Sequence, residues 1–294
     1  MKTHIPTLLQ REWMQHKRGW LISAFAPPLL FLAVLPFAQF QGGKFTSNWN
    51  LDSQELQSAL IVLASAITVY VIAMLVALFQ LPGLARRDTQ DRSIEFWLSL
   101  PGRPGESVLA TVLAHAWLAP LLCAAIGVLL GIPIAMGVLS RISGVDTIFA
   151  VNWGEALFMT LPILLRGLAG TVPLMLWLSP LIFVLMAASS WLKRLGVPVV
   201  LVGGGVAVAV LDNVYGIQWP WQALQGLNDQ IGRAMIHDGA SLGTAMQSGT
   251  NLMAWAMQDL GGALAELASL QFLVWAAIAV AAFALVVLKR SRGG

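Results

Sequence analysis

The sequence predicts an all-α integral membrane protein with six transmembrane helices, an N-terminal interfacial amphipathic helix, and a cytoplasmic helix between spans two and three. Three observations predict this fold class. The 294 residues are 57% hydrophobic and only 11% charged, whereas soluble domains carry roughly 25% charged residues. The mean hydropathy is +0.76. Long apolar runs alternate with short charged segments, and lysines and arginines gather where the runs end.

Residues 1–19 predict a short amphipathic helix that lies in the inner membrane interface. Apolar Leu9 and Trp13 are four residues apart and share one helical face. Tryptophan suits the headgroup level, and basic side chains suit anionic lipid. The predicted helix is marked by Leu9, Arg11, Glu12, Trp13, Lys17 and Arg18. The apolar run 20–40 follows and is long enough to cross about 30 Å of hydrocarbon. It is longer than the apolar region of a cleavable signal peptide. We therefore expect it to be retained as the first span.

Five further apolar runs complete the six predicted spans. They cover about 58–82, 107–139, 168–192, 196–211 and 269–288. The piece 156–165 is too short to cross a membrane and predicts an interfacial or re-entrant helix on the outer side. Segment 212–268 is the longest stretch outside the predicted spans, and we expect it on the external side. Small residues let helix backbones approach in lipid, so the run Gly203, Gly204 and Gly205 predicts a helix-packing seam.

The distribution of basic residues predicts the orientation of these spans. If both chain ends lie in the cytoplasm, only Lys44, Arg141, Arg166 and Arg233 of the 17 lysines and arginines fall on the outer side. Cytoplasmic loops carry an excess of basic residues. The same rule explains the pI near 9.4 without nucleic acid as a partner, because the basic residues stand at span ends.

A charged segment, 83–106, separates spans two and three and contains a short amphipathic stretch. Asp91, Arg92, Ser93, Ile94, Glu95, Phe96, Trp97, Leu98, Ser99 and Leu100 have helical spacing and are followed by Pro101 and Gly102. Its arginines place it in the cytoplasm. A helix that shows Phe and Trp to water needs a partner to cover it. We therefore interpret residues 91–100 as a docking helix for another subunit.

The sequence lacks the motifs of an enzyme or of a metal centre. It contains no P-loop, no H-E-x-x-H, no C-x-x-C and no G-x-S-x-G, so we expect no catalytic residue and no cofactor on this chain. His4 and His16 have no partner at ligand spacing and are expected to be solvated. His115 lies inside a span, where we expect a bond to a neighbouring helix. The single cysteine, Cys123, is expected to pack in an apolar environment.

At this point the residues carry a family resemblance. The Leu9-Gln10-Arg11-Glu12-Trp13 start, the stretch from Asp91 to Pro101 and the six-span plan resemble the permease subunit of bacterial ABC-2 type transporters over most of the chain. The D-R-S-I-x-F-W-x-S-L-P stretch is its most specific part. The resemblance implies a single transmembrane domain over residues 1–294 in the bacterial cytoplasmic membrane, with residues 1–19 as the family's elbow helix and residues 91–100 as its coupling helix.

The resemblance also implies partners and a mechanism. Two copies of a separate cytoplasmic ATPase, which holds ATP and Mg²⁺, would dock on two permeases; the second permease is a copy or a homologue. A second cytoplasmic contact would lie at Lys193, Arg194 and Leu195. The implied function is ATP-driven substrate movement, with export expected. A scaffold or sensor protein that relays ATPase motion to a partner without transport is the alternative. A secondary transporter is disfavoured, because five of the spans lack acidic and basic residues in their middles.

Overall fold

A computed structural model describes residues 5–38, 53–86, 104–248 and 251–292 of the chain. All regular structure in these residues is helical. The principal helices are α1 (Ile5–Val34), α2 (Gln54–Leu84), α5 (Pro104–Val112), α6 (Ala119–Ser143), α8 (Trp153–Leu192), α10 (Gly204–Asn213), α11 (Trp219–Met235), α12 (Gly239–Ser248), α13 (Leu252–Ala265) and α14 (Leu270–Ser291). Short turns complete them: η1 (Leu35–Phe37), η2 (Leu113–Leu118), α7 (Thr147–Ala150), η3 (Lys193–Leu195), α9 (Gly196–Pro198), η4 (Val199–Gly203) and η5 (Glu266–Ala268).

Polar side chains define where several of these helices begin. The Ser53 Oγ accepts a hydrogen bond from the Leu56 N–H at 3.1 Å, and the Ser269 Oγ accepts one from the Phe272 N–H at 3.1 Å. At the start of α8 the Asn152 Oδ1 accepts from the Glu155 N–H at 3.2 Å. Each contact satisfies an N–H group of the first turn that has no partner within the helix. Long apolar sequences then continue the helices.

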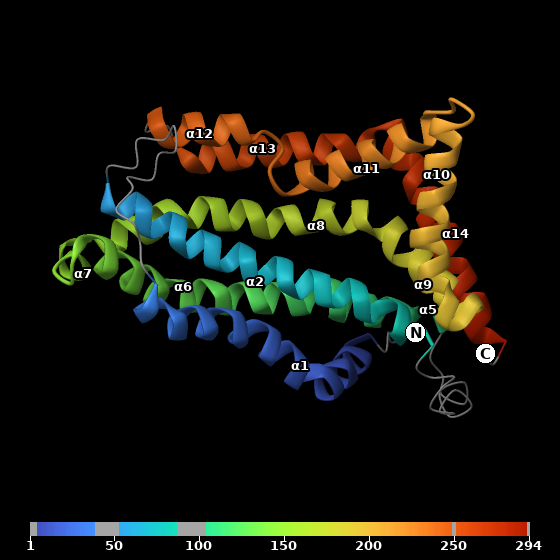
Figure 1. Ribbon diagram of the computed structural model, residues 1–294, viewed down its shortest axis with the longest axis horizontal. Helices are drawn as coiled ribbons and strands as arrows, with labels where there is room; N and C mark the ends of the chain where they lie inside the picture. Colours follow the sequence, from blue (N-terminus) through green and yellow to red (C-terminus); the bar gives the residue numbers. More distant parts are fainter. Residues whose placement is uncertain (1–4, 39–52, 87–103, 249–250, 293–294) are drawn as a thin grey trace.

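Helix α8 is the centre of the bundle. Figure 1 shows α2, α6 and α8 along the long axis of the molecule, and α2 packs on both α6 and α8. Helix α1 packs on α6, while α11, α13 and α14 pack on α8. The main core joins Trp177, Ile182 and Met186 of α8 to Leu81 of α2 and Val286 of α14, and all five are almost fully buried. In a membrane such helices are held together by close van der Waals packing, because lipid tails are as apolar as these side chains.

Two glycines of α6 allow its close contact with α2. A Cβ atom added at Gly127 would lie 2.9 Å from the Ala66 Cα, and one added at Gly131 would lie 3.0 Å from the Val62 Cα. The Ser65 Oγ also donates a hydrogen bond of 2.8 Å to the Gly127 carbonyl. Small residues four apart bring helix backbones together in this way in membranes. The α2–α6 pair is thus held as one unit.

Within the part of the chain that the structure describes, five stretches are long and apolar enough to cross a membrane: Ile5–Phe37, Gln54–Leu84, Pro104–Ser143, Trp153–Asn213 and Leu270–Ser291. The predicted all-helical, multi-pass membrane class agrees with this finding. The fourth stretch contains both predicted spans 168–192 and 196–211, which meet at a turn at Lys193. The count of six spans therefore stays a prediction.

Helix boundaries differ from the sequence prediction in three places. Residues 5–19 of the amphipathic segment and residues 20–34 of the first span form one continuous helix, α1. The piece 156–165 is not a separate helix but the first part of α8, which is 40 residues long and contains Arg166. Segment 212–268 packs along α8 through α11 and α13. Local hydropathy did not reveal these continuities, because the buried charges Glu12 and Arg166 are accommodated by partners from elsewhere in the chain.

Candidate functional site

The predicted docking helix, Asp91 to Leu100, lies outside the described residues. Its flanks are described: α2 ends at Leu84 and is followed by a turn to Arg86, and α5 begins at Pro104. Both flanks lie at the same end of the bundle (Figure 1). Segment 87–103 therefore joins α2 directly to α5, which packs against α1, α2 and α14.

The second predicted contact, Lys193 to Leu195, forms a tight exposed turn between α8 and α9. All three side chains are exposed. Lys193 has φ 55°, and it is the one non-glycine residue with a positive φ in the described part of the chain. The turn needs Gly196, because a Cβ atom there would collide with the Ala188 carbonyl. In Figure 1 this turn lies at the end of the bundle where α2 ends and α5 begins.

Of the six predicted elbow residues, Leu9 is half-buried against Trp20, and the other five divide into two groups. Trp13, Lys17 and Arg18 are exposed, in keeping with a place at an interface. Arg11 and Glu12 instead point into the bundle, with 9% and 0% of their surfaces exposed. A carboxylate is buried only where partners compensate the loss of water. Glu12 has such partners on α1, α5 and η2.

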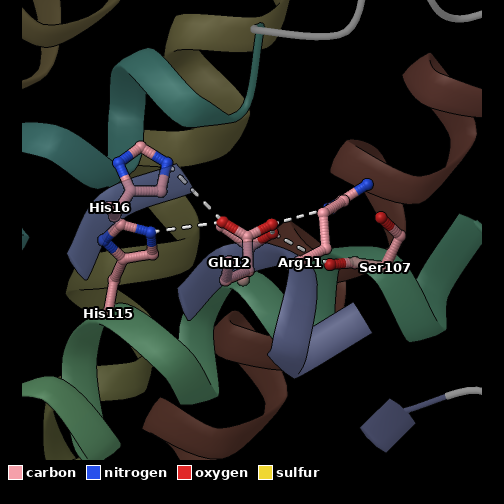
Figure 2. A network of polar contacts seen from close by, with 6 residues as sticks. Arg11, Glu12, His16, Ser107 and His115 are labelled. Atoms are coloured by element: carbon pink, nitrogen blue, oxygen red, sulfur yellow. Dashed lines mark hydrogen bonds and ion pairs between the residues drawn. The ribbon is translucent and has the colours of Figure 1, made fainter. Parts of the chain in front are cut away.

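Glu12 is the centre of a buried polar cluster, which we call the Glu12 cluster: Arg11, Glu12, His16, Thr111 and His115. The Glu12 Oε1 accepts a hydrogen bond of 2.6 Å from the Arg11 Nη2 and one of 3.1 Å from the Thr111 Oγ1. Its Oε2 lies 3.3 Å from the His115 Nε2 and 3.7 Å from the His16 Nε2. Figure 2 shows both imidazole rings directing one nitrogen at the same carboxylate. One carboxylate thus connects the first helix to the third apolar stretch.

The cluster depends on a local irregularity of the third stretch. His115 lies in η2, a π-helical turn between α5 and α6, and such turns often occur at functional sites. The His115 ring is 1% exposed and packs edge-on against Trp20, with centroids 5.2 Å apart. Its Nδ1 is buried and has no hydrogen-bond partner among the described residues. His115 also lines a cavity of about 10 Å³ with Trp20, Gln80 and Cys123, which is roughly the space of one water molecule.

A second buried cluster joins α8 to α13. The Arg166 Nε donates to the Asp259 Oδ2 at 2.8 Å, and the two side chains are 1% and 2% exposed. The same Oδ2 accepts from the His237 N–H at 3.0 Å, and the Oδ1 accepts from the Asp238 N–H at 2.8 Å. The Arg166 Nη1 donates to the Ala234 carbonyl at 3.2 Å. This pair therefore also fixes the connection between α11 and α12.

The structure corrects two expectations and confirms two about single residues. His16 is half-buried beside Glu12 and is not simply solvated, and Arg166 is a buried core residue and not an outer interfacial charge. His115 bonds a neighbouring helix, as predicted, and Cys123 is buried. Sequence reasoning missed that His16 follows Glu12 by four residues, which places both on one helical face. That spacing was the available signal for a shared site.

The glycine run in the fifth predicted span forms no close helix contact with the described residues. A Cβ atom added at Gly203, Gly204 or Gly205 would have no atom within 4 Å among the described residues. The close helix contact occurs at Gly127 and Gly131. A seam at residues 203–205 stays a prediction, now for contact with a second chain.

Comparison with known proteins gives no match to this chain, whether with protein-family models, with curated proteins or with solved structures.

Proposed function

We infer that this chain is the membrane-spanning permease of an ATP-driven transporter of the ABC-2 type, with a separate ATPase docked on residues 91–100. The observation that carries the proposal is the arrangement at one end of the bundle. The two flanks of segment 87–103 and the exposed basic turn Lys193–Leu195 lie at that same end (Figure 1). The absence of a P-loop from the sequence requires that ATP be bound by a partner.

The packing supports a route from a docked ATPase to the spans. Segment 87–103 is covalently joined to α2 and to α5, and α5 continues through η2 into α6. Helices α2 and α6 are held together at Gly127 and Gly131. A push on the segment would thus move both helices as one rigid body, with α1 following through its contact with α6. Rigid-body motion of this kind is a common mode of conformational switching.

The proposal also includes a second permease. No residue of η4 or α10 is buried, and both are rich in apolar side chains that include Leu201, Val202 and Val206. Such a helix needs lipid or another protein around it. We assign part of this surface to a second copy, with export through a path formed between the two. The chain would reside in a bacterial cytoplasmic membrane with both ends inside.

Docking is tested by co-purification of the ATPase with two variants, Trp97→Ala and Glu95→Arg. The candidate ATPase is to be sought among P-loop proteins encoded by the neighbouring reading frames. We expect each variant to retain less than about a tenth of the wild-type ATPase, because loss of a central aromatic contact at an interface costs about 2 kcal/mol or more. The matched controls are Phe149→Ala and Glu155→Arg, which are exposed at the opposite end of the bundle and should bind normally. Normal ATPase recovery with Trp97→Ala and Glu95→Arg would refute the docking role.

The orientation is tested with introduced cysteines. Cys123 is the single cysteine of the chain and is buried, so a membrane-impermeant thiol reagent reports on new sites. Ser99→Cys should react only when the cytoplasmic face is accessible, and Ser47→Cys only from the outside. Labelling of Ser99→Cys in intact cells would remove the basis for an ATPase contact.

A relay protein without transport makes a different prediction. Both functions require ATPase docking. A transporter also needs a path, so compounds from a substrate panel should stimulate ATP hydrolysis by the reconstituted complex. A complex that binds ATPase and is stimulated only by a protein partner would be a relay.

A further inference from the structure

The Glu12 cluster has no role in the transport proposal, yet it collects three metal-ligating side chains in the interior of the bundle. Glu12, His16 and His115 each offer one ligand atom, and these atoms all lie within 4.8 Å of one another. Two ligands come from one turn of α1, and the third comes from the π-helical turn of the third stretch. This combination ties together two elements that are about 100 residues apart.

The distances from the Glu12 Oε2 to the two imidazole nitrogens are compatible with a shared metal as well as with hydrogen bonds. N–H···O bonds are commonly 2.7–3.2 Å long, whereas the two imidazole nitrogens lie 3.3 and 3.7 Å from the same carboxylate oxygen. Zinc–nitrogen and zinc–oxygen bonds of about 2.0–2.2 Å in a tetrahedron separate neighbouring ligand atoms by about 3.3–3.6 Å. The two carboxylate–imidazole separations are close to the edges of such a tetrahedron, and all three ligand atoms lie within 4.8 Å of one another.

The surroundings hold the carboxylate in the orientation that a metal requires. The Oε1 is bound by Arg11 and Thr111, so the Oε2 is directed at the two imidazoles (Figure 2). Ligand carboxylates in metal sites are oriented by such outer contacts. The buried Nδ1 of His115 has no protein partner among the described residues, and its side chain lines a cavity of about one water molecule. A water there would complete the outer contact that metal-bound imidazoles make through their second nitrogen.

We propose that Glu12, His16 and His115 form a Zn²⁺ site with three protein ligands. Two imidazoles and one carboxylate are a ligand set of Zn²⁺, and the tetrahedral spacing favours Zn²⁺ over the octahedral ions Mg²⁺ and Ca²⁺. The fourth position belongs to water or to a donor from elsewhere. Bound Zn²⁺ joins α1 to the third apolar stretch at the cluster. Thr111 is a positioning residue, because it acts on the metal through Glu12.

The test is a Zn²⁺ titration of the purified full-length chain in detergent, after chelator extraction, in competition with a fluorescent zinc indicator. The ligand variants are Glu12→Gln, His16→Asn and His115→Asn. The matched control is His237→Asn, a histidine outside the cluster that lies 3.6 Å from Glu266. A second readout is the visible spectrum of bound Co²⁺, whose intensity distinguishes tetrahedral from octahedral coordination.

We expect one Zn²⁺ per wild-type chain and an intense tetrahedral Co²⁺ spectrum. Each ligand variant should weaken Zn²⁺ binding at least about 100-fold, and Thr111→Val about 10–100-fold, the range typical of outer contacts. His237→Asn should bind as the wild type does. Wild-type binding no tighter than that of Glu12→Gln would overturn the proposal, as would a Co²⁺ spectrum typical of octahedral coordination.

His16→Asn keeps the test decisive if His115→Asn or Glu12→Gln does not fold. His16 lies at the margin of the cluster with a side chain 27% exposed, so its loss leaves the buried core in place. A folded His16→Asn variant with unchanged Zn²⁺ affinity would exclude the three-ligand site.

Discussion

Replacement of Asp259 by alanine should destabilise the protein more than any single change at the surface. Asp259→Ala removes the partner of a buried guanidinium and leaves Arg166 with one described hydrogen bond, to the Ala234 carbonyl at 3.2 Å. Breaking a buried ion pair on one side costs about 3–5 kcal/mol, because the remaining charge has no compensation. The backbone N–H groups of His237 and Asp238 also lose their acceptor.

The reverse change, Arg166→Met, should cost less. Asp259 would keep its two backbone N–H donors, at 3.0 and 2.8 Å, and hydrogen bonds to a charged group contribute about 1.5–3 kcal/mol each. We therefore expect Arg166→Met to lower the free energy of unfolding by about 1–2 kcal/mol less than Asp259→Ala does. The double variant that combines Asp259→Ala with Arg166→Met should be more stable than Asp259→Ala alone, because no isolated buried charge remains.

The measurement is equilibrium unfolding in detergent, followed by tryptophan fluorescence and by far-ultraviolet circular dichroism. The control is Arg233→Ala, since Arg233 is 54% exposed and its contact with Glu266 is 3.6 Å long; exposed pairs contribute about 0–1 kcal/mol. Equal losses for Asp259→Ala and Arg233→Ala would refute the view that this pair is buried and structural. A larger loss for Arg166→Met than for Asp259→Ala would refute the role assigned to the backbone donors.

Three further substitutions test the packing. Gly127→Leu should weaken the contact of α6 with α2, because the Ala66 Cα lies 2.9 Å from the position of the new Cβ. Overpacking of this kind lowers the free energy of unfolding by about 1–3 kcal/mol, so the unfolding midpoint in detergent should fall. An unchanged midpoint would contradict this contact. Trp177→Ala should lower the free energy of unfolding by about 3–5 kcal/mol in the same assay. Trp177 is 1% exposed, and its ring centroid lies 5.2 Å from that of Phe272 in an edge-on contact. A loss below about 1 kcal/mol would place Trp177 outside the core. Gly204→Ala should leave the stability of the monomer unchanged or raise it by up to about 1 kcal/mol. The reason is that a Cβ atom at this helical position has no atom within 4 Å among the described residues. If residues 203–205 contact a second copy, cross-linking will show that the same alanine weakens the dimer.

Composition and periodicity were sufficient to predict a helical, multi-pass membrane class, because apolar runs must be buried in lipid or core wherever they occur. The stretch Gln54–Leu84 agrees with the predicted span 58–82, and Leu270–Ser291 with 269–288. The same reasoning divided α8 into two pieces, because it read Arg166 as an interruption. A buried arginine within a helix is permitted only by its partner Asp259, which lies 93 residues away.

The sequence by itself determined that this chain is a helical, multi-pass membrane protein, since helical period and hydropathy are properties of neighbouring residues. It also marked residues 91–100 as the stretch most in need of a partner. Only the tertiary structure placed His115 against Glu12 across 103 positions and closed α6 on α2 at Gly127. Such encounters depend on how whole helices pack, and the energy that makes a buried carboxylate or arginine tolerable comes from residues that no local pattern brings together.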